Sequence, residues 1–344
     1  MIPLGPIAVG VEGTVLTSSD RERLMHPLVG IVILFTRNYE KPDQLVRLCR
    51  EIHAVRDPPL LIAVDHEGGR VQRFRDGFTP LPPMRRLGEL WDRDVLLACR
   101  VAASLGYVMA AELRAHGVDM TFAPVLDVDH GRSTVIGDRA LHSDPRVVSM
   151  LAAYLTHGLL IAGMANCGKH FPGHGWAEAD SHTALPVDTR SQDEIMKSDV
   201  APYRWLGSML VGVMPGHVIY TQIDQRPAGF SRRWINTVLR GELGFSGAIF
   251  SDDLLMAGAG VAGSVAERAT AALGAGCDFA LVCNDTAAMD QALDAVQWKR
   301  TAEFDARLAR LQPRGKESTV QQLAANDLYR NARRDLEEIL EQVG

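Results

Sequence analysis

The sequence of 344 residues has few cysteines and no excess of positive charge. Its five cysteines are an odd number and lie far apart, without the spacing of zinc ligands, and a chain of this length does not depend on disulfides. Lysine and arginine number 36 against 42 aspartates and glutamates, which gives a formal charge of −6. The charge therefore excludes a basic surface that would attract nucleic acid or an anionic membrane, and the scattered cysteines favour a reducing compartment.

Long hydrophobic segments are also lacking. No apolar stretch reaches the roughly 18 residues that a membrane helix needs. The N-terminal segment MIPLGPIAVGVEG has no basic region and only a short apolar run, unlike a secretory signal. Apolar residues still make up 47% of the chain and charged residues 23%, as in ordinary globular proteins. We therefore expect a soluble, cytoplasmic protein.

Eight short runs rich in Val, Ile, Leu and Phe predict the strands. They lack polar alternation, as expected of parallel strands that are covered on both faces. The runs are Ile7–Val11, Val29–Phe35, Leu60–Val64, Met120–Val125, Asn166–His170, Leu210–Met214, Ala248–Ser251 and Phe279–Cys283. The segments between them carry helix signals, such as Asp144 before Pro145 and the capping box of Ser191 with Glu194.

Alternating strands and helices fit either a doubly wound sheet or a closed barrel. The count of eight strands, and the lack of a G-x-G-x-x-G motif after an early strand, favour an α/β fold of the (β/α)8 TIM type. Such barrels typically have about 250 residues. We expect a single catalytic barrel domain in residues 1–298. Residues 299–344 are charged and helical, and we expect them to form a C-terminal extension that packs on the barrel.

Polar residues follow five of the predicted strands. Alone, each group could cap a helix or lie in a solvated loop. In a barrel, however, the C-terminal ends of the strands meet on the face that carries the chemistry, so five polar ends predict a site there. The segments are Asp65–Arg70, Asp127–Asp129, Lys169–Gly175, Met214–His217 and Ser251–Asp253.

Two acid-containing pairs are the strongest candidates for chemistry. Neighbouring strand residues point to opposite sides, so we expect Asp252 to face the barrel mouth, ionised by nearby positive charge, and Asp253 to cap the next helix. Asp180 and His182 lie on the long, glycine-containing connection Phe171–Arg190, which could close over a ligand. A carboxylate beside an imidazole can deliver a proton near neutral pH.

A metal site is the main alternative use of these histidines. His170, His174 and His182 with Asp252 are a conceivable ligand set. The first two lie on a Pro-Gly loop, where a spacing of four does not align side chains as it does on a helix. We therefore expect no metal and no other cofactor.

The segments KHFPGHG and DSH, within Lys169–His182, and FSDDL at 250–254 resemble glycoside hydrolase family 3. More narrowly, they resemble its single-domain β-N-acetylglucosaminidases of bacterial peptidoglycan recycling. The resemblance covers Val9 to Asn284. Further matching segments are DHEGGRVQRF, APVLDV, VIGDR and MPGHVIY.

The resemblance implies a retaining β-N-acetylhexosaminidase. Asp252 matches the nucleophile, His182 the acid/base and Asp180 its partner. The positions that match sugar-binding residues are Asp65, Arg73, Arg139, Lys169 and His170. The implied substrates are muropeptides, N-acetylglucosaminyl-1,6-anhydro-muramyl peptides from the cell wall, and nothing in the sequence requires more than a monomer.

Four other readings stay open at this point. The substrate's own acetamido group could participate, with Asp252 and Asp253 as an orienting and protonating pair, although their opposed directions argue against it. A histidine acid/base would also suit phosphorolysis. A metal hydrolase would lose activity to chelators. A non-catalytic sugar sensor would not need an acid/base pair.

Overall fold

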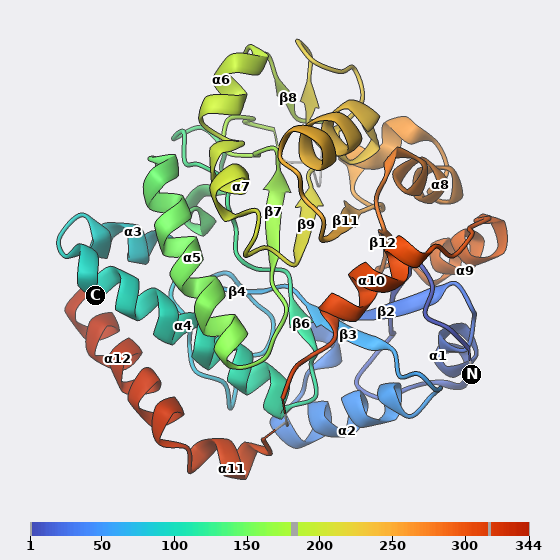
Figure 1. Ribbon diagram of the computed structural model, residues 1–344. Coiled ribbons are helices and arrows are strands. Elements are labelled where there is room, and N and C mark those ends of the chain that lie inside the picture. Colours follow the sequence, from blue (N-terminus) through green and yellow to red (C-terminus); the bar gives the residue numbers. More distant parts are fainter. Residues whose placement is uncertain (1, 180–184, 316–317, 344) are drawn as a thin grey trace.

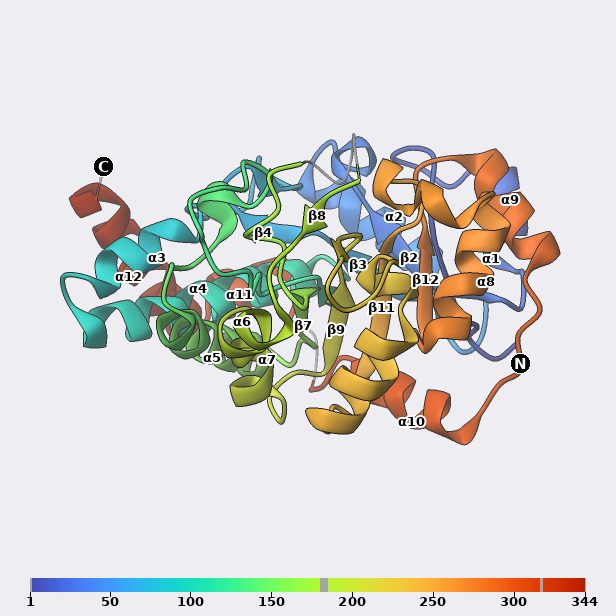
Figure 2. The same ribbon diagram turned by 90° about the horizontal axis from the view of Figure 1, so that it is seen from above.

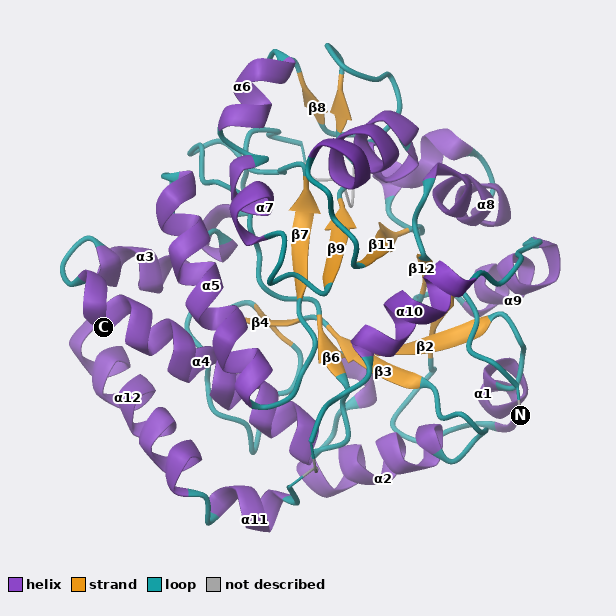
Figure 3. Ribbon diagram, viewed as in Figure 1, coloured by secondary structure: helices purple, strands orange, loops and turns teal. Residues whose placement is uncertain are grey.

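Eight parallel strands form the centre of the molecule and helices surround them (Figure 3). The computed structural model describes residues 2–179, 185–315 and 318–343. The strands of the barrel are β1 (Ile7–Gly10), β2 (Val29–Leu34), β3 (Leu61–Val64), β6 (Met120–Thr121), β7 (Cys167–Phe171), β9 (Gly212–Pro215), β11 (Ala248–Asp253) and β12 (Phe279–Val282). Each coincides with a predicted run, and almost every strand residue is buried.

The strand order is that of a closed barrel. The sheet runs β6-β3-β2-β1-β12-β11-β9-β7. Parallel bridges from Met120 to Ala165 and from Val125 to Lys169 join its two ends and complete the ring. The predicted (β/α)8 barrel is therefore confirmed, and the doubly wound sheet is excluded because its edges would stay open.

Strand β6 is shorter than predicted. The apolar run Met120–Val125 predicts six residues, but the regular strand ends at Thr121. Pro124 has no N–H to donate to a neighbouring strand, so the ladder is interrupted there. The carbonyls of Ala123 and Pro124 still accept the N–H groups of Cys167 and Lys169 in β7, at 2.8 and 3.2 Å, and Val125 forms a bridge to Lys169.

Helices α5 and α6 begin where their capping residues predict. Asp144 accepts the backbone N–H of Arg146 at the start of α5, and Ser191 forms a capping box with Glu194 at the start of α6. The helices are α1 (Ser18–Leu24), α2 (Pro42–His53), α3 (Arg85–Trp91), α4 (Val95–Ala115), α5 (Pro145–Ile161), α6 (Gln192–Lys197), α7 (Ala201–Leu206), the π-helix η4 (Arg233–Glu242), α8 (Val265–Ala275), α9 (Thr286–Ala295), α10 (Ala302–Leu311), α11 (Val320–Ala324) and α12 (Asp327–Val343). Short hairpin strands β4 (His66–Gly68) and β5 (Val71–Gln72), and the pair β8 (Val187–Asp188) and β10 (Ile219–Tyr220), lie outside the barrel.

Helix α4 corrects one expectation from the sequence. Within the described part of the chain it is the one helix long and apolar enough to cross a membrane, although no uninterrupted apolar run predicted it. Buried positions make up 61% of that apolar window, and α4 packs between α5 and α12 (Figure 1). Its apolar character is therefore explained by two packing partners.

The C-terminal helices contact the barrel at two places. Phe304 of α10 packs on Phe279 of β12, with ring centroids 5.2 Å apart, and α10 lies on the side of the molecule away from β4 and β8 (Figure 2). Helix α12 packs along α4, where the Tyr329 hydroxyl donates to the Glu112 carboxylate at 2.6 Å. The end that α10 leaves uncovered is the one where the strands finish.

Candidate active site

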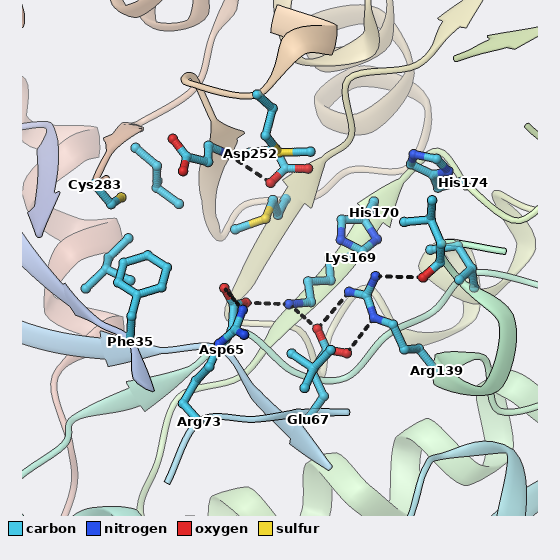
Figure 4. A pocket seen from close by; sticks show the side chains of 18 of the residues that line it. Phe35, Asp65, Glu67, Arg73, Arg139, Lys169, His170, His174, Asp252 and Cys283 are labelled. Atoms are coloured by element: carbon cyan, nitrogen blue, oxygen red, sulfur yellow. Dashed lines mark hydrogen bonds and ion pairs between the residues drawn. The ribbon is translucent and has the colours of Figure 1, made fainter. Parts of the chain in front are cut away.

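A cavity of about 670 Å³ opens at the C-terminal ends of the barrel strands. Its lining comes from the ends of β2, β3, β7, β9, β11 and β12 and from the segment around Arg139. Six of the residues singled out from the sequence lie in it: Asp65, Arg73, Arg139, Lys169, His170 and Asp252 (Figure 4). Apolar side chains also line the cavity, among them Ile33, Phe35, Met214, Met256 and Leu281.

Lys169 is the centre of a network of charges on the cavity floor. Its Nζ lies 2.6 Å from Asp65 Oδ1 and 2.6 Å from Glu67 Oε1, and the residue is only 2% exposed. Arg139 donates two hydrogen bonds of 2.8 Å to the same Glu67 carboxylate. Arg73 lies at the edge, with its Nη2 3.9 Å from Asp65 Oδ2.

These contacts determine which groups are charged. Burial raises the pKa of Glu67, but the charges of Arg139 and Lys169 outweigh burial and hold that pKa well below its ordinary value. Burial lowers the pKa of Lys169, and the carboxylates of Asp65 and Glu67 more than compensate, so its pKa is raised. Glu67 and Lys169 are therefore both ionised near neutral pH. The network presents oriented charged groups to polar ligand atoms, which form the stronger kind of hydrogen bond.

Asp252 lies at the end of β11, across the cavity from this network (Figure 4). Burial raises the pKa of Asp252. The nearby His170, His217 and Lys169 lower it by more than burial raises it, so the net shift is downward. An ionised carboxylate facing a cavity is suited to act as a nucleophile or to stabilise positive charge.

The expectation that Asp252 alone of the two acids faces the cavity is wrong. Asp253 also lines the cavity. The register of β11 against β12 shifts between Phe250 and Asp253, and such a bulge breaks the strict alternation of side chains. Asp253 accepts the N–H of Leu255 at 3.0 Å, as a local cap, and the amide of Asn284 at 2.7 Å. Burial, with the charges of Asp252 and Asp65, raises its pKa to about 6.

His170 is held from behind by Asp127. The Nδ1 atom of His170 lies 2.7 Å from Asp127 Oδ2. Asp127 is fully buried, and its other oxygen accepts the backbone N–H groups of His170 and His174. Burial raises the pKa of Asp127, but the nearby rings of His170 and His174 and the hydrogen bonds from both residues bring it below its ordinary value.

The predicted pair Asp180 and His182 lies outside the described residues. The chain leading towards it is anchored at Trp176, whose ring centroid lies 4.3 Å from the guanidinium carbon of Arg132 and 4.6 Å from that of Arg190. After residues 180–184, the chain forms β8, which pairs with β10.

Three site residues received no role from the sequence. Glu67, Asp127 and Asn284 are held by side chains distant in the chain, namely Arg139, His170 and Arg37. In the sequence, only their position shortly after predicted strands indicated that they could belong to the site. Residues that cap helices occupy the same kind of position, so the sequence did not separate the two roles. Among the residues that the structure describes, no group of three or more His, Cys, Asp or Glu is placed to hold a metal ion.

A closed parallel barrel with an ionised carboxylate and a network of charged groups at its C-terminal end defines a barrel enzyme. Residues 9–313 match the N-terminal domain of glycosyl hydrolase family 3. The chain belongs to this family and is a glycoside hydrolase, as the sequence motifs predicted.

Full-length relatives agree with this assignment. A β-hexosaminidase of Bordetella avium is 56% identical over 342 residues, which are 99% of this chain and 97% of that protein. A β-hexosaminidase of Nitrosospira multiformis is 54% identical over 330 residues, covering 96% and 95%. The crystal structure of NagZ from Neisseria gonorrhoeae in complex with N-trifluoroacetyl-D-glucosamine superposes with a TM-score of 0.93 at 44% identity, covering 98% of both chains.

Proposed function

We propose that the chain is a retaining β-N-acetylhexosaminidase that removes terminal β-linked N-acetylglucosamine from peptidoglycan-derived fragments. The observation that carries the proposal is the ionised Asp252 facing the charged floor of Lys169, Glu67 and Arg139 across one cavity. The names of the similar β-hexosaminidases supply the sugar class. The family resemblance supplies the natural substrate, a muropeptide with a 1,6-anhydro end, and with it a role in cell-wall recycling in the cytoplasm.

The proposed reaction is a double displacement. Asp252 attacks the anomeric carbon and forms a covalent bond to it, while the bond from that carbon to the leaving oxygen breaks. His182, oriented by Asp180, gives its proton to that oxygen. In the second step His182 takes a proton from water, whose oxygen displaces Asp252 and releases the sugar. No metal or other cofactor takes part.

The charged floor of the cavity would hold the sugar during both steps. Asp65 and Lys169 can exchange hydrogen bonds with adjacent hydroxyls, and Arg139, Arg73 and His170 line the same cavity. Charged groups in fixed positions form strong hydrogen bonds with a hydroxyl that is correctly placed. A sugar of the wrong stereochemistry leaves these groups unpaired and therefore binds more weakly.

The placement of Asp253 supports a second mechanism within the same function. Both acids line the cavity, so the expectation that only one of them can reach a ligand no longer argues against participation by the acetamido group. A carboxyl group with a pKa of about 6 can also exchange a proton near neutral pH. Trapping with a fluorinated aryl glycoside decides between the two, because only double displacement labels Asp252 covalently.

Turnover of an aryl β-N-acetylglucosaminide tests the function itself. We expect hydrolysis that is independent of added phosphate, and a marked preference over the matching glucoside, which differs only at the 2-position. No turnover of either compound would refute the proposal. A rate that rises with phosphate, with sugar phosphate as the product, would replace hydrolysis by phosphorolysis.

A further inference from the structure

Asp127 lies behind the cavity wall and has three donors around its two oxygens. Its Oδ1 accepts the backbone N–H of His174 at 2.7 Å and that of His170 at 3.2 Å. Its Oδ2 lies 2.7 Å from Nδ1 of the His170 ring. The residue has no exposed surface and is not part of the cavity lining, so it acts on a ligand only through its neighbours.

The arrangement determines where the His170 ring carries its hydrogen. A carboxylate can only accept, so the hydrogen shared with Asp127 belongs to Nδ1 of the ring. In a neutral ring the other nitrogen, Nε2, then has a free lone pair. Since Nδ1 is directed to a residue outside the cavity and the ring itself lines the cavity, Nε2 is the nitrogen available to a ligand (Figure 4).

We propose that Asp127 is a positioning residue that holds His170 as the Nδ1–H tautomer and so presents Nε2 to the sugar as a hydrogen-bond acceptor. A sugar hydroxyl would donate to this atom while accepting from a neighbouring cation. The inference rests on the proposed function for its ligand, but the tautomer is a property of the free protein.

Asp127→Asn isolates the tautomer because the backbone fixes the orientation of the new amide. Two backbone N–H groups, those of His170 and His174, converge on the position of Oδ1 and require an acceptor there. The amide oxygen must take that position, which turns the NH2 group towards Nδ1. A donor facing Nδ1 favours the opposite tautomer, with hydrogen on Nε2. The two backbone hydrogen bonds are retained.

Asp119→Asn is the matched control. Asp119 is also buried, accepts a backbone N–H from Ile62 at 2.7 Å and lies 3.0 Å from Nε2 of His53. It directly precedes β6, at the end of the barrel away from the cavity. We expect Asp119→Asn to leave hydrolysis of the aryl N-acetylglucosaminide unchanged within about twofold.

Nitrogen-15 NMR of histidine-labelled protein reads the tautomer directly, with His170→Ala to assign the signal. We expect Nδ1–H in the wild type and Nε2–H in Asp127→Asn. We also expect kcat/KM to fall about 10- to 100-fold in Asp127→Asn, the range for leaving a buried polar group mispaired. In a His170→Ala background the same substitution should change kcat/KM by less than about twofold.

Three results would overturn the inference. These are a wild-type His170 with hydrogen on Nε2 or on both nitrogens, an unchanged tautomer in Asp127→Asn, and an equal loss of activity in both backgrounds. If Asp127→Asn fails to fold, the wild-type spectrum alone tests the inference, because it shows which ring nitrogen of His170 carries the hydrogen. A wild type that does not hydrolyse the aryl substrate would refute the proposed function, while the spectrum would still report the tautomer.

Discussion

Replacing Glu67 by glutamine should destabilise the protein more than any exposed charge neutralisation. Glu67 is 2% exposed and accepts two hydrogen bonds from Arg139, while Lys169 lies 2.6 Å away. The amide keeps the shape of the side chain but can accept only through its oxygen. Its NH2 group must then face either Arg139 or Lys169, both of which only donate.

The size of the effect follows from the loss of one partner in a buried ion pair. Removing such a partner costs about 3–5 kcal/mol, and the retained oxygen and the Asp65–Lys169 contact reduce this to about 2–4 kcal/mol. The entropy of unfolding of a chain of 344 residues is roughly 0.7 kcal/mol/K. The expected decrease in Tm is therefore about 3–6 °C.

Thermal and urea unfolding measure this loss, with Glu51→Gln as control. Glu51 pairs with Arg21 at 2.5 Å, but its side chain is 42% exposed, so its removal should cost less than about 1 kcal/mol. The difference between the two variants should persist in 1 M salt, because buried pairs are little screened. A Glu67→Gln protein with a Tm within 1 °C of the wild type would refute the reasoning.

Three further predictions concern the cavity. Asp252→Ala should reduce turnover of the aryl substrate at least about 10³-fold, because the nucleophile acts mainly in the transition state. The affinity for the sugar should change little, and a parallel loss of affinity measured by calorimetry would contradict the prediction. Lys169→Met leaves Asp65 and Glu67 facing each other and should weaken sugar binding by about 10-fold or more, so unchanged binding would exclude Lys169 from the sugar site. The pKa of Asp253 is raised to about 6 in the folded state, against an ordinary value near 4, so its stabilising contribution is complete below about pH 4 and is lost as the pH rises to 6. Asp253→Asn should therefore gain stability relative to the wild type between pH 4 and pH 7 in urea unfolding, and a relative loss over that range would show that the shift has another cause.

The barrel could be predicted because its signals are local. A strand covered on both faces requires an uninterrupted apolar run, and a helix start requires a side-chain acceptor near its first N–H groups, as at Asp144 and Ser191. The parallel order of the strands then places residues such as Asp65, Lys169 and Asp252 at one end. The motifs that resemble the family contain the same residues, so both arguments select one face.

The directions and partners of side chains could not be predicted in the same way. The register of β11 against β12 shifts between Phe250 and Asp253, a feature that the sequence of β11 does not show by itself, and both Asp252 and Asp253 line the cavity. Glu67 and Asp127 acquire their charge states from Arg139 and His170, more than 40 residues away in the chain.

The sequence by itself determined the type of fold, the face of the barrel that carries polar groups and the family. The tertiary structure decided which of those polar groups meet, how the barrel closes across Pro124, and which carboxyl groups stay ionised. The physical reason is that backbone preferences and burial patterns act over a few residues. Hydrogen bonds and electrostatic shifts depend instead on distances of a few ångströms between segments that only folding brings together.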